Sequence, residues 1–451
     1  MPNPKNHSNR AEHGLHGRLE EGLASVYCNP FFRNVATVIT GTIAAQAITV
    51  VGSPFLARVY DPTSFGVFGV FVSVATITGT MCCWAYDWAI AIPSKQSDAA
   101  NLLGLALFLA IITAMLSTLA IIATGDTIAK APALDTLSPW LALAPAGGLI
   151  IATHKALTFW SARHKDFRRI AASHSTRSLV TLAIQASAGI AGFISSGLVL
   201  GFLAGQLAGT LFLAKKTWQD HARLFARRIR PRHLRRLAAA HIDFPKYRAP
   251  QQILVSSSKS SILITLAFFF GAEFAGLFAL AQRAVYSPLM MVAQSIQQVF
   301  IPAASETYHS SPDLLLGKVT RLTCTIFAIT LLIVSPILIL GPNIFELLFG
   351  IQWREAGHYA QLLAIAALTQ VTAQPSESIA PILNLQRFHL LFQSILMFSL
   401  IAAVTFGGHV GQPLIAIGGY ALCFAIFKLG LIGYMQLRLR RLSIQSLERM
   451  N

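Results

Sequence analysis

The stretch Ala275–Glu306, AGLFALAQRAVYSPLMMVAQSIQQVFIPAASE, is apolar enough to cross a lipid bilayer, yet it contains an arginine, Arg283. At helical spacing its polar side chains gather on one face, opposite a face of Leu, Ala, Val and Phe. That face holds Arg283, Tyr286, Met290, Gln294 and Gln297. A charge at the centre of a membrane costs about 3 kcal/mol on insertion scales, so it faces a wet cavity or a buried partner. We expect Arg283 to hold an anion in such a cavity; the alternative is a packing arginine paired with a carboxylate.

The composition predicts an all-α polytopic membrane protein. Of the 451 residues, 54% are hydrophobic and only 12% are charged, whereas soluble globular proteins carry about 25% charged residues. The five cysteines show no metal-ligand spacing, and the chain contains no GxxxxGK[ST], HExxH or GxSxG motif. We therefore expect no cofactor, no bound metal and no enzymatic activity.

Apolar runs of about 20 residues, broken by polar or Gly/Pro punctuation, predict twelve transmembrane helices. The runs cover residues 34–57, 65–92, 99–124, 137–160, 170–194, 197–216, 249–271, 274–304, 315–341, 356–380, 387–407 and 413–436. Strands of a membrane barrel would instead alternate over about 10 residues.

Basic residues predict the orientation of these helices. Most of the 35 Lys and Arg residues lie in the N-terminal tail, in the loops after even-numbered runs, or at the C-terminus. The other loops hold only Arg58, Lys130 and Arg354. By the positive-inside rule both termini are cytoplasmic, and this placement accounts for most of the net charge of +17 without a nucleic-acid partner.

The runs divide into two predicted lobes of six helices. The expected domains are an N-terminal tail (1–32), an N-lobe (33–216), a basic linker (217–247), a C-lobe (248–437) and a C-terminal tail (438–451). In the linker, apolar residues among arginines predict helical segments that lie on the inner leaflet and attract anionic lipid headgroups. These apolar residues are Leu224, Phe225, Ile229 and Leu234.

A shift of 210 residues lays Gly66-Val67-Phe68 onto Gly276-Leu277-Phe278, each after a long apolar run and a brief turn. An even number of helices per repeat makes the two copies parallel in the membrane, related by an axis along the membrane normal. Ligands of such transporters bind between the two halves.

Polar side chains at helical spacing within the apolar runs predict the lining of a shared cavity. The expected substrate-binding residues are Arg283, Lys259, Gln46, Gln252, Gln294, Gln297 and Gln374. Asp87 and Glu377 are candidates for ion coupling, because a buried carboxylate can bind and release a proton. Alternatively the polar residues join helices, at about 0.6 kcal/mol per bond. Asp87 could pair with Lys95 at the membrane boundary, and Lys155 could extend to the headgroups.

Three stretches of the chain carry a resemblance to a known family. The first runs from Pro54, PFLARVYDPTSFGVFGVF, followed by YDWAIAIPS from Tyr86. The second is FPKYRAPQQILVSSSKSS from Phe244, with FFFGAEFAGLFALAQR and QQVFIPAASE after it. The third is IFELLFGIQWREAGHYAQLLA from Ile344. Together they resemble the polysaccharide-transport branch of the multidrug/oligosaccharidyl-lipid/polysaccharide (MOP) flippase superfamily.

The resemblance implies two six-helix bundles that open alternately to either side of the membrane. It implies transport of lipid-linked oligosaccharides, typically on undecaprenyl diphosphate, from the inner to the outer leaflet of a bacterial plasma membrane. By position, Arg283 and Lys259 match cavity cations thought to hold the diphosphate. The chain departs from the family's Arg-Tyr-acidic pattern in reading Ala85-Tyr86-Asp87.

The sequence thus predicts a flippase for surface polysaccharide biosynthesis, coupled to an ion gradient, with glycosyltransferases and a polysaccharide polymerase as partners. Two alternatives stay open. One is a multispan glycan polymerase or ligase, which commonly needs a larger outer loop than those around 125–139 and 341–357. The other is a drug or ion antiporter of the same fold, which more often places acids in its cavity.

Overall fold

The computed structural model describes residues 30–124, 138–228, 231–310, 312–380, 382–383 and 385–450. Every regular element in these ranges is helical. The first half contains α2 (Pro30–Val59), α3 (Pro62–Cys82), α4 (Tyr86–Ala89), α5 (Gln96–Ala123), α7 (Ser138–Leu141), α8 (Ala144–Arg163), α9 (Phe167–Ile190), α10 (Ile194–Arg228) and α11 (Pro231–Ala240). The second contains η3 (Phe244–Arg248), α12 (Ala249–Phe270), α13 (Ala272–Ala281), η4 (Gln282–Tyr286), α14 (Ser287–Ser310), α15 (Pro312–Phe349), η5 (Ile351–Trp353), α16 (Arg354–Ile379), α17 (Gln386–Val410) and α18 (Pro413–Met450).

The long helices correspond one to one with the twelve expected runs, if α13, η4 and α14 count as one rod. The expected run 65–92 is wrong in its second part. Helix α3 ends at Cys82, and Trp84 and Ala85 then take positive φ values of 48° and 60°. Such values are uncommon outside glycine and interrupt a right-handed helix. The break turns the short helix α4, which carries Asp87, back towards the bundle.

The fold class, an all-helical polytopic membrane protein, is confirmed. By length and hydropathy alone, six helices among the described residues could cross a membrane, or seven if the bent pair 244–258 and 260–270 is one span. The long helices outside this set, such as α16, have lower hydropathy because many of their polar side chains are buried against other helices. Helix α16 shows this best, since Gln370, Gln374 and most of its other residues are buried.

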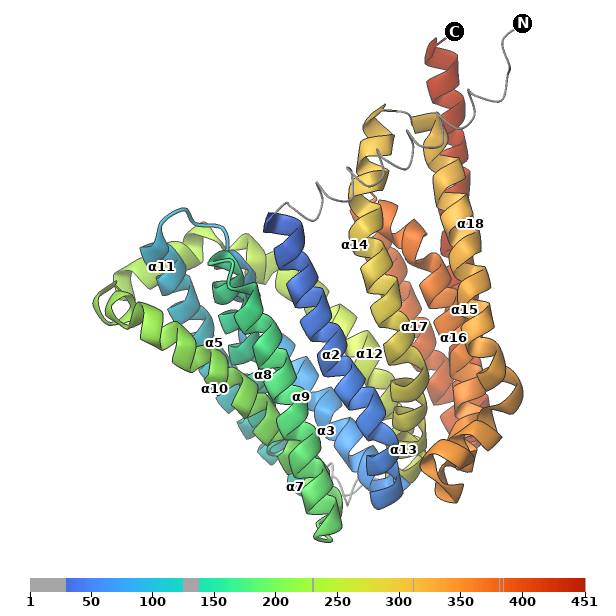
Figure 1. The fold of residues 1–451 in the computed structure, drawn as a ribbon, viewed down its shortest axis with the longest axis horizontal. Coiled ribbons are helices and arrows are strands. Elements are labelled where there is room, and N and C mark those ends of the chain that lie inside the picture. The colour runs from blue at the N-terminus through green and yellow to red at the C-terminus, as the bar shows by residue number, and fades with distance from the viewer. Residues whose placement is uncertain are drawn as a thin grey trace, which may run out of the picture.

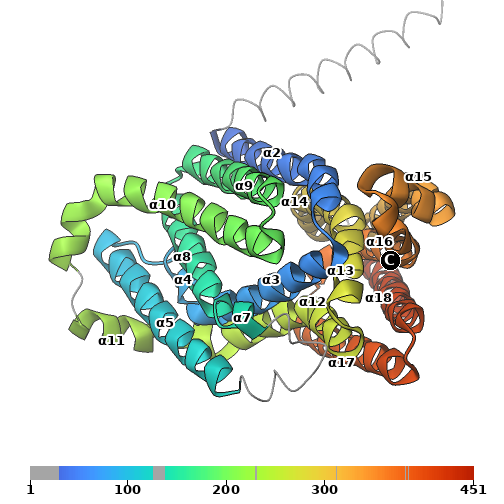
Figure 2. The same ribbon diagram turned by 90° about the horizontal axis from the view of Figure 1, so that it is seen from below.

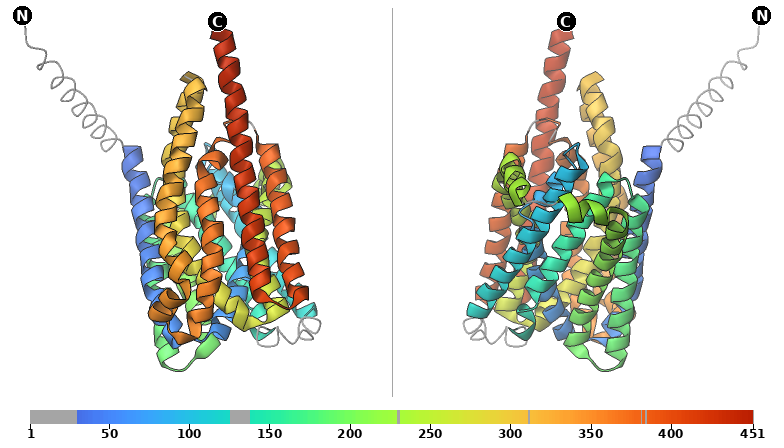
Figure 3. Two further views of the ribbon diagram at one scale, coloured as in Figure 1. Left: turned by 90° about the vertical axis from the view of Figure 1, so that its right-hand side faces the viewer. Right: turned by 90° about the vertical axis from the view of Figure 1, so that its left-hand side faces the viewer.

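Each half of the chain packs mainly on itself (Figure 1). Helix α9 contacts α2 and α10, and α8 contacts α3 and α5; in the second half α16 contacts α15 and α18, and α17 contacts α12 and α18. The halves meet where α3 packs against α12 and α13, which Figure 2 shows from below. Helix α2 begins and α18 ends at the same end of the bundle (Figure 3).

Two glycines allow the closest approach between the halves. A Cβ atom on Gly66 would lie 1.7 Å from the carbonyl oxygen of Ala272, and one on Gly276 would lie 1.8 Å from that of Pro62. The shift of 210 residues maps Pro62 onto Ala272 and Gly66 onto Gly276. Each glycine therefore meets the counterpart of the residue that the other glycine meets, as a two-fold axis between repeats requires.

A further pair marks the position of this axis. A Cβ atom on Gly69 would lie 3.3 Å from the Cβ atom of Ala279, which is the residue that the same shift assigns to Gly69. Equivalent residues touch each other only beside the axis that relates them. The crossing of α3 and α13 is therefore the symmetric centre of the interface between the halves.

Hydrogen bonds and rings join the halves near the start of α3. The Trp353 indole Nε1 donates to the Ala57 carbonyl oxygen at 2.6 Å, and Arg58 Nη2 donates to the Leu347 carbonyl oxygen at 3.0 Å. The Phe65 and Trp353 rings pack edge to face with centroids 5.1 Å apart. These contacts hold one end of the bundle together.

The described part of the basic linker is helical, in α10 and α11, while its position on the inner leaflet stays a prediction. Helix α10 continues to Arg228, because Leu, Ala, Lys and Arg all favour a helix. Leu224, Phe225 and Leu234 pack against a buried cluster of the protein that includes Trp160, so these side chains do not extend freely into lipid. Ile229 lies outside the described residues. Likewise α18 runs through the expected C-terminal tail to Met450.

We predict that Gly66→Ala destabilises the protein by about 1–3 kcal/mol, because the new methyl group would overlap the Ala272 backbone. Gly418→Ala is the matched control, since Gly418 lies in α18 with open space around its Cβ position. Thermal unfolding of the purified variants in detergent measures both. A Gly66→Ala protein as stable as the Gly418→Ala protein would contradict the tight crossing.

Candidate functional site

A cavity of about 590 Å³ lies between α3 of the first half and helices of the second half. Its walls come from α3, α12, the η4–α14 rod, α16, α17 and α18. The lining is rich in polar groups, which include Ser73, Thr76, Gln251, Ser258, Gln282, Arg283, Tyr286, Gln297, Gln370, Gln374, Glu377, His389, Gln393 and Lys428. A polar chamber of this size inside apolar helices is suited to a hydrophilic ligand.

Arg283 lies on the wall of this cavity within η4, a π-helical segment. Pro288 follows two residues after η4 and has no N–H group, so it cannot donate the helical hydrogen bond to the carbonyl of residue 284. A π-helical turn accommodates that missing bond, and such turns are frequent at functional sites. Among the described residues no carboxylate lies within ion-pairing distance of Arg283. The guanidinium is therefore available to an anion in the cavity.

The wall of the same cavity also holds a buried ion pair. Lys428 of α18, only 2% exposed, pairs with Glu377 of α16. Gln370 Nε2 lies 3.4 Å from both Gln374 Oε1 and Glu377 Oε2, which extends the network along α16. The lysine neutralises the carboxylate, so Arg283 contributes uncompensated positive charge to the chamber.

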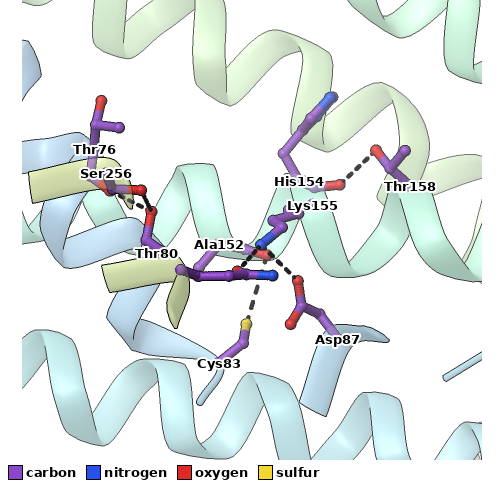
Figure 4. Close-up of polar contacts among 10 residues, drawn as sticks. Thr76, Thr80, Cys83, Asp87, Ala152, His154, Lys155, Thr158 and Ser256 are labelled. Atoms are coloured by element: carbon purple, nitrogen blue, oxygen red, sulfur yellow. Dashed lines mark hydrogen bonds and ion pairs between the residues drawn. The ribbon is translucent and has the colours of Figure 1, made fainter. Parts of the chain in front are cut away.

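A smaller cavity of about 350 Å³ adjoins the first, because Gln251 and Val255 of α12 line both. On its wall Lys155 of α8 pairs with Asp87 at 3.0 Å and donates to Gln252 Oε1 at 3.0 Å (Figure 4). The expectation that Asp87 pairs with Lys95 is wrong, and so is the extension of Lys155 to headgroups. The break after α3 turns α4 inward, which brings Asp87, 1% exposed, to Lys155.

A hydroxyl pair also joins the halves here. Thr80 Oγ1 of α3 lies 3.0 Å from Ser256 Oγ of α12, as Figure 4 shows beside Lys155. The small cavity is therefore formed by the two halves together.

The structure brings together several of the residues expected from the sequence. Arg283, Gln297, Gln374 and Glu377 line the large cavity, and Gln252 lines the small one. Gln46 is partly buried on α2 and lines neither cavity. The side chains of Lys259 and Gln294 lie outside those that the structure describes. The functional roles of all these residues stay predictions.

Other lining residues were not expected from the sequence. Arg248 and Gln251 line the small cavity, and His389 and Gln393 of α17 line the large one. The i, i+4 spacing of His389 and Gln393 could have predicted a polar face on this helix, because it places both side chains on one side. Arg248 gave none, since it ends a long basic segment that topology alone explains.

Sequence comparison identifies the family. The profile of a family described as polysaccharide biosynthesis protein matches residues 55–358. The chain belongs to this family. The match covers most of the chain and confirms the resemblance found in the sequence. No curated protein sequence matches the chain.

The fold is that of MOP-superfamily transporters. The lipid II flippase MurJ in an inward closed conformation matches with a TM-score of 0.69 at 11% identity, over 92% of this chain and 91% of that one. An inward-facing multidrug resistance MATE transporter matches with a TM-score of 0.66 at 14% identity, over 90% and 96%. A MOP superfamily transporter from Pyrococcus furiosus matches with a TM-score of 0.59 at 13% identity, over 91% and 96%.

We predict that Lys428→Met alone destabilises the protein by about 3–5 kcal/mol, because it leaves the Glu377 carboxylate without its buried partner. Adding Glu377→Gln should recover most of that loss, since the amide carries no charge. Thermal unfolding of the two variants in detergent measures the difference. Equal unfolding temperatures for the single and double variants would show that the pair is not coupled in this way.

Proposed function

We propose that the protein is a flippase that moves a lipid-linked oligosaccharide from the inner to the outer leaflet of a bacterial plasma membrane. The observation that carries this proposal is Arg283, a cation without a described carboxylate partner, on the wall of a 590 Å³ polar cavity inside a membrane-transporter fold. Membership of a polysaccharide biosynthesis family and a MurJ-like fold support it.

The physical problem for such a substrate is its headgroup. A diphosphate that carries sugars cannot cross about 30 Å of hydrocarbon unaided, because an unpaired charge there loses its hydration. A cavity with a fixed cation and many amides replaces the lost water. The lipid tail needs no protein around it and stays in the bilayer during transport.

The chemistry of the wall suits the two parts of the headgroup. A guanidinium binds phosphate oxygens through two parallel N–H donors, which gives a strong and oriented contact. Around Arg283 the amides of Gln297, Gln370, Gln374 and Gln393 can donate to and accept from sugar hydroxyls. Arg283 thus recognises the diphosphate, and the amides solvate the glycan.

Rocking of the two halves about the glycine crossing would carry the headgroup across. The described conformation is closed near the start of α3, where Trp353 bonds to Ala57. The bonds from Thr80 to Ser256 and from Lys155 to Gln252 join the halves at the other end of α3. Opening the cavity to either side would therefore break the contacts at one end while those at the other end persist.

Asp87 and Glu377 keep their proposed role in ion coupling. Each carboxylate pairs with a lysine, Lys155 or Lys428, on a cavity wall. A proton that binds to either carboxylate would release its lysine, so protonation would change the charge of the cavity during the cycle. Glycosyltransferases, a polymerase and anionic lipid headgroups at the basic segment remain the expected partners.

A drug antiporter of the same fold is less consistent with the cavity. An unpaired Arg283 repels the cationic compounds that such an exporter commonly carries. The one acid among the described lining residues, Glu377, is neutralised by Lys428 and so offers no free negative charge to a cation.

We predict that Arg283→Ala lowers flipping of an undecaprenyl-diphosphate oligosaccharide at least tenfold, because a charge-assisted bond to phosphate contributes about 1.5–3 kcal/mol. The measurement uses proteoliposomes, with the glycan on the outer face detected by a lectin. Arg321→Ala is the matched control, since Arg321 is exposed on α15 away from both cavities. Full flipping by the Arg283→Ala protein would remove Arg283 from the mechanism, and no flipping by the wild type would overturn the proposed function.

A further inference from the structure

The small cavity contains an arginine that the proposed mechanism does not use. The guanidinium carbon of Arg248 lies 4.1 Å from the ring centroid of Trp88, a cation–π contact between the end of η3 and helix α4. A guanidinium that stacks on a ring keeps its N–H edge free for other acceptors. Among the described residues no carboxylate pairs with Arg248.

The rest of the wall leaves the charge of Arg248 uncancelled and orients a hydrogen-bond donor. Lys155 and Asp87 neutralise each other, which leaves the charge of Arg248 uncompensated in the cavity. Because Gln252 Oε1 accepts the bond from Lys155, the Gln252 amide nitrogen is left as a donor to a ligand. Gln251 and Ser256 complete a polar lining. This combination suits a carboxylate or a phosphate group.

The site at Arg248 and the cavity at Arg283 adjoin each other, because Gln251 and Val255 of α12 line both. The intervening face of α12 is polar through Gln251, Ser256 and Ser258, and Gln251 lines both cavities. One extended ligand could therefore occupy both sites.

We propose that Arg248, held by Trp88 and flanked by Gln252, forms a second anion subsite that binds a negatively charged substituent of the glycan. The inference rests on the proposed function and narrows its substrate class to an acidic oligosaccharide. Arg283 holds the diphosphate, while Arg248 holds a carboxylate or phosphate substituent of the glycan. A neutral glycan fills the same chamber without this contact.

The test compares three undecaprenyl-diphosphate oligosaccharides of equal length: one neutral, one with a terminal uronic acid, and one with a terminal phosphate. Binding to the purified protein in detergent gives the ratio of affinities between each acidic glycan and the neutral one. We expect a ratio of about ten for the wild type, which is about 1.4 kcal/mol. Arg248→Gln should reduce the ratio to about one, while the Arg321→Ala control keeps it.

The ratio separates recognition from a structural role. If Arg248→Gln weakens all three glycans by the same factor, Arg248 only supports the fold and the proposal is overturned. A wild type that binds acidic and neutral glycans equally also overturns it, although the proposed flippase function stands. A preference for the uronic acid alone or for the phosphate alone supports the subsite and names its ligand. Binding of no glycan overturns both the subsite and the proposed function.

Discussion

A buried positive charge without a carboxylate partner is the constraint on which the rest of the structure depends. Arg283 lies in the middle of a rod of apolar helix, where an isolated charge costs about 3 kcal/mol on insertion scales. The charge is tolerated because the η4 segment lies on the wall of a polar cavity. The same cavity requires α16 to carry glutamines on a buried face, and requires Lys428 to neutralise Glu377. The interior is thus polar where a hydrophilic ligand would lie.

The interface between the halves meets a second requirement, since a transporter must be stable and still able to rearrange. Small residues allow α3 and α13 to cross with backbones in contact at Gly66 and Gly276. The contacts at this crossing follow the symmetry of the internal repeat, since Gly66 meets Ala272 and Gly276 meets Pro62. By contrast, the contacts away from the crossing are single bonds, such as Thr80 to Ser256 and Trp353 to Ala57. A few such bonds can break and re-form in each cycle.

The sequence predicted the features that repeat along the chain. Apolar runs gave the number and order of the long helices, because a helix needs about 20 residues to cross the hydrocarbon. Helical spacing placed Arg283, Tyr286, Met290 and Gln297 on one face, and all four line the large cavity. The internal repeat that makes Gly66 and Gly276 equivalent is present in the sequence, whereas the contact between them is a feature of the packing.

Features that depend on distant or strained residues could not be predicted. Lys155 and Asp87 are far apart in the sequence and meet only because Trp84 and Ala85 break the helix between them, and no glycine or proline marks that break. Gln46 matched the spacing of a polar stripe, yet it lines neither cavity, and its helix α2 packs mainly on α9. Arg248 ends a segment rich in arginines that the positive-inside rule already explains, so its position in the sequence did not indicate a cavity residue. In each case tertiary packing determines which side chain reaches a partner or a cavity, and the local sequence pattern does not contain that information.

The most direct test of the central claim is a cryo-electron microscopy structure of the protein in nanodiscs with an undecaprenyl-diphosphate oligosaccharide. The account predicts density for the diphosphate within about 3 Å of the Arg283 guanidinium, the usual length of a charge-assisted hydrogen bond. It also predicts that the glycan follows the glutamine-lined wall. Density for the diphosphate elsewhere, with Arg283 turned away from the ligand, would contradict the account.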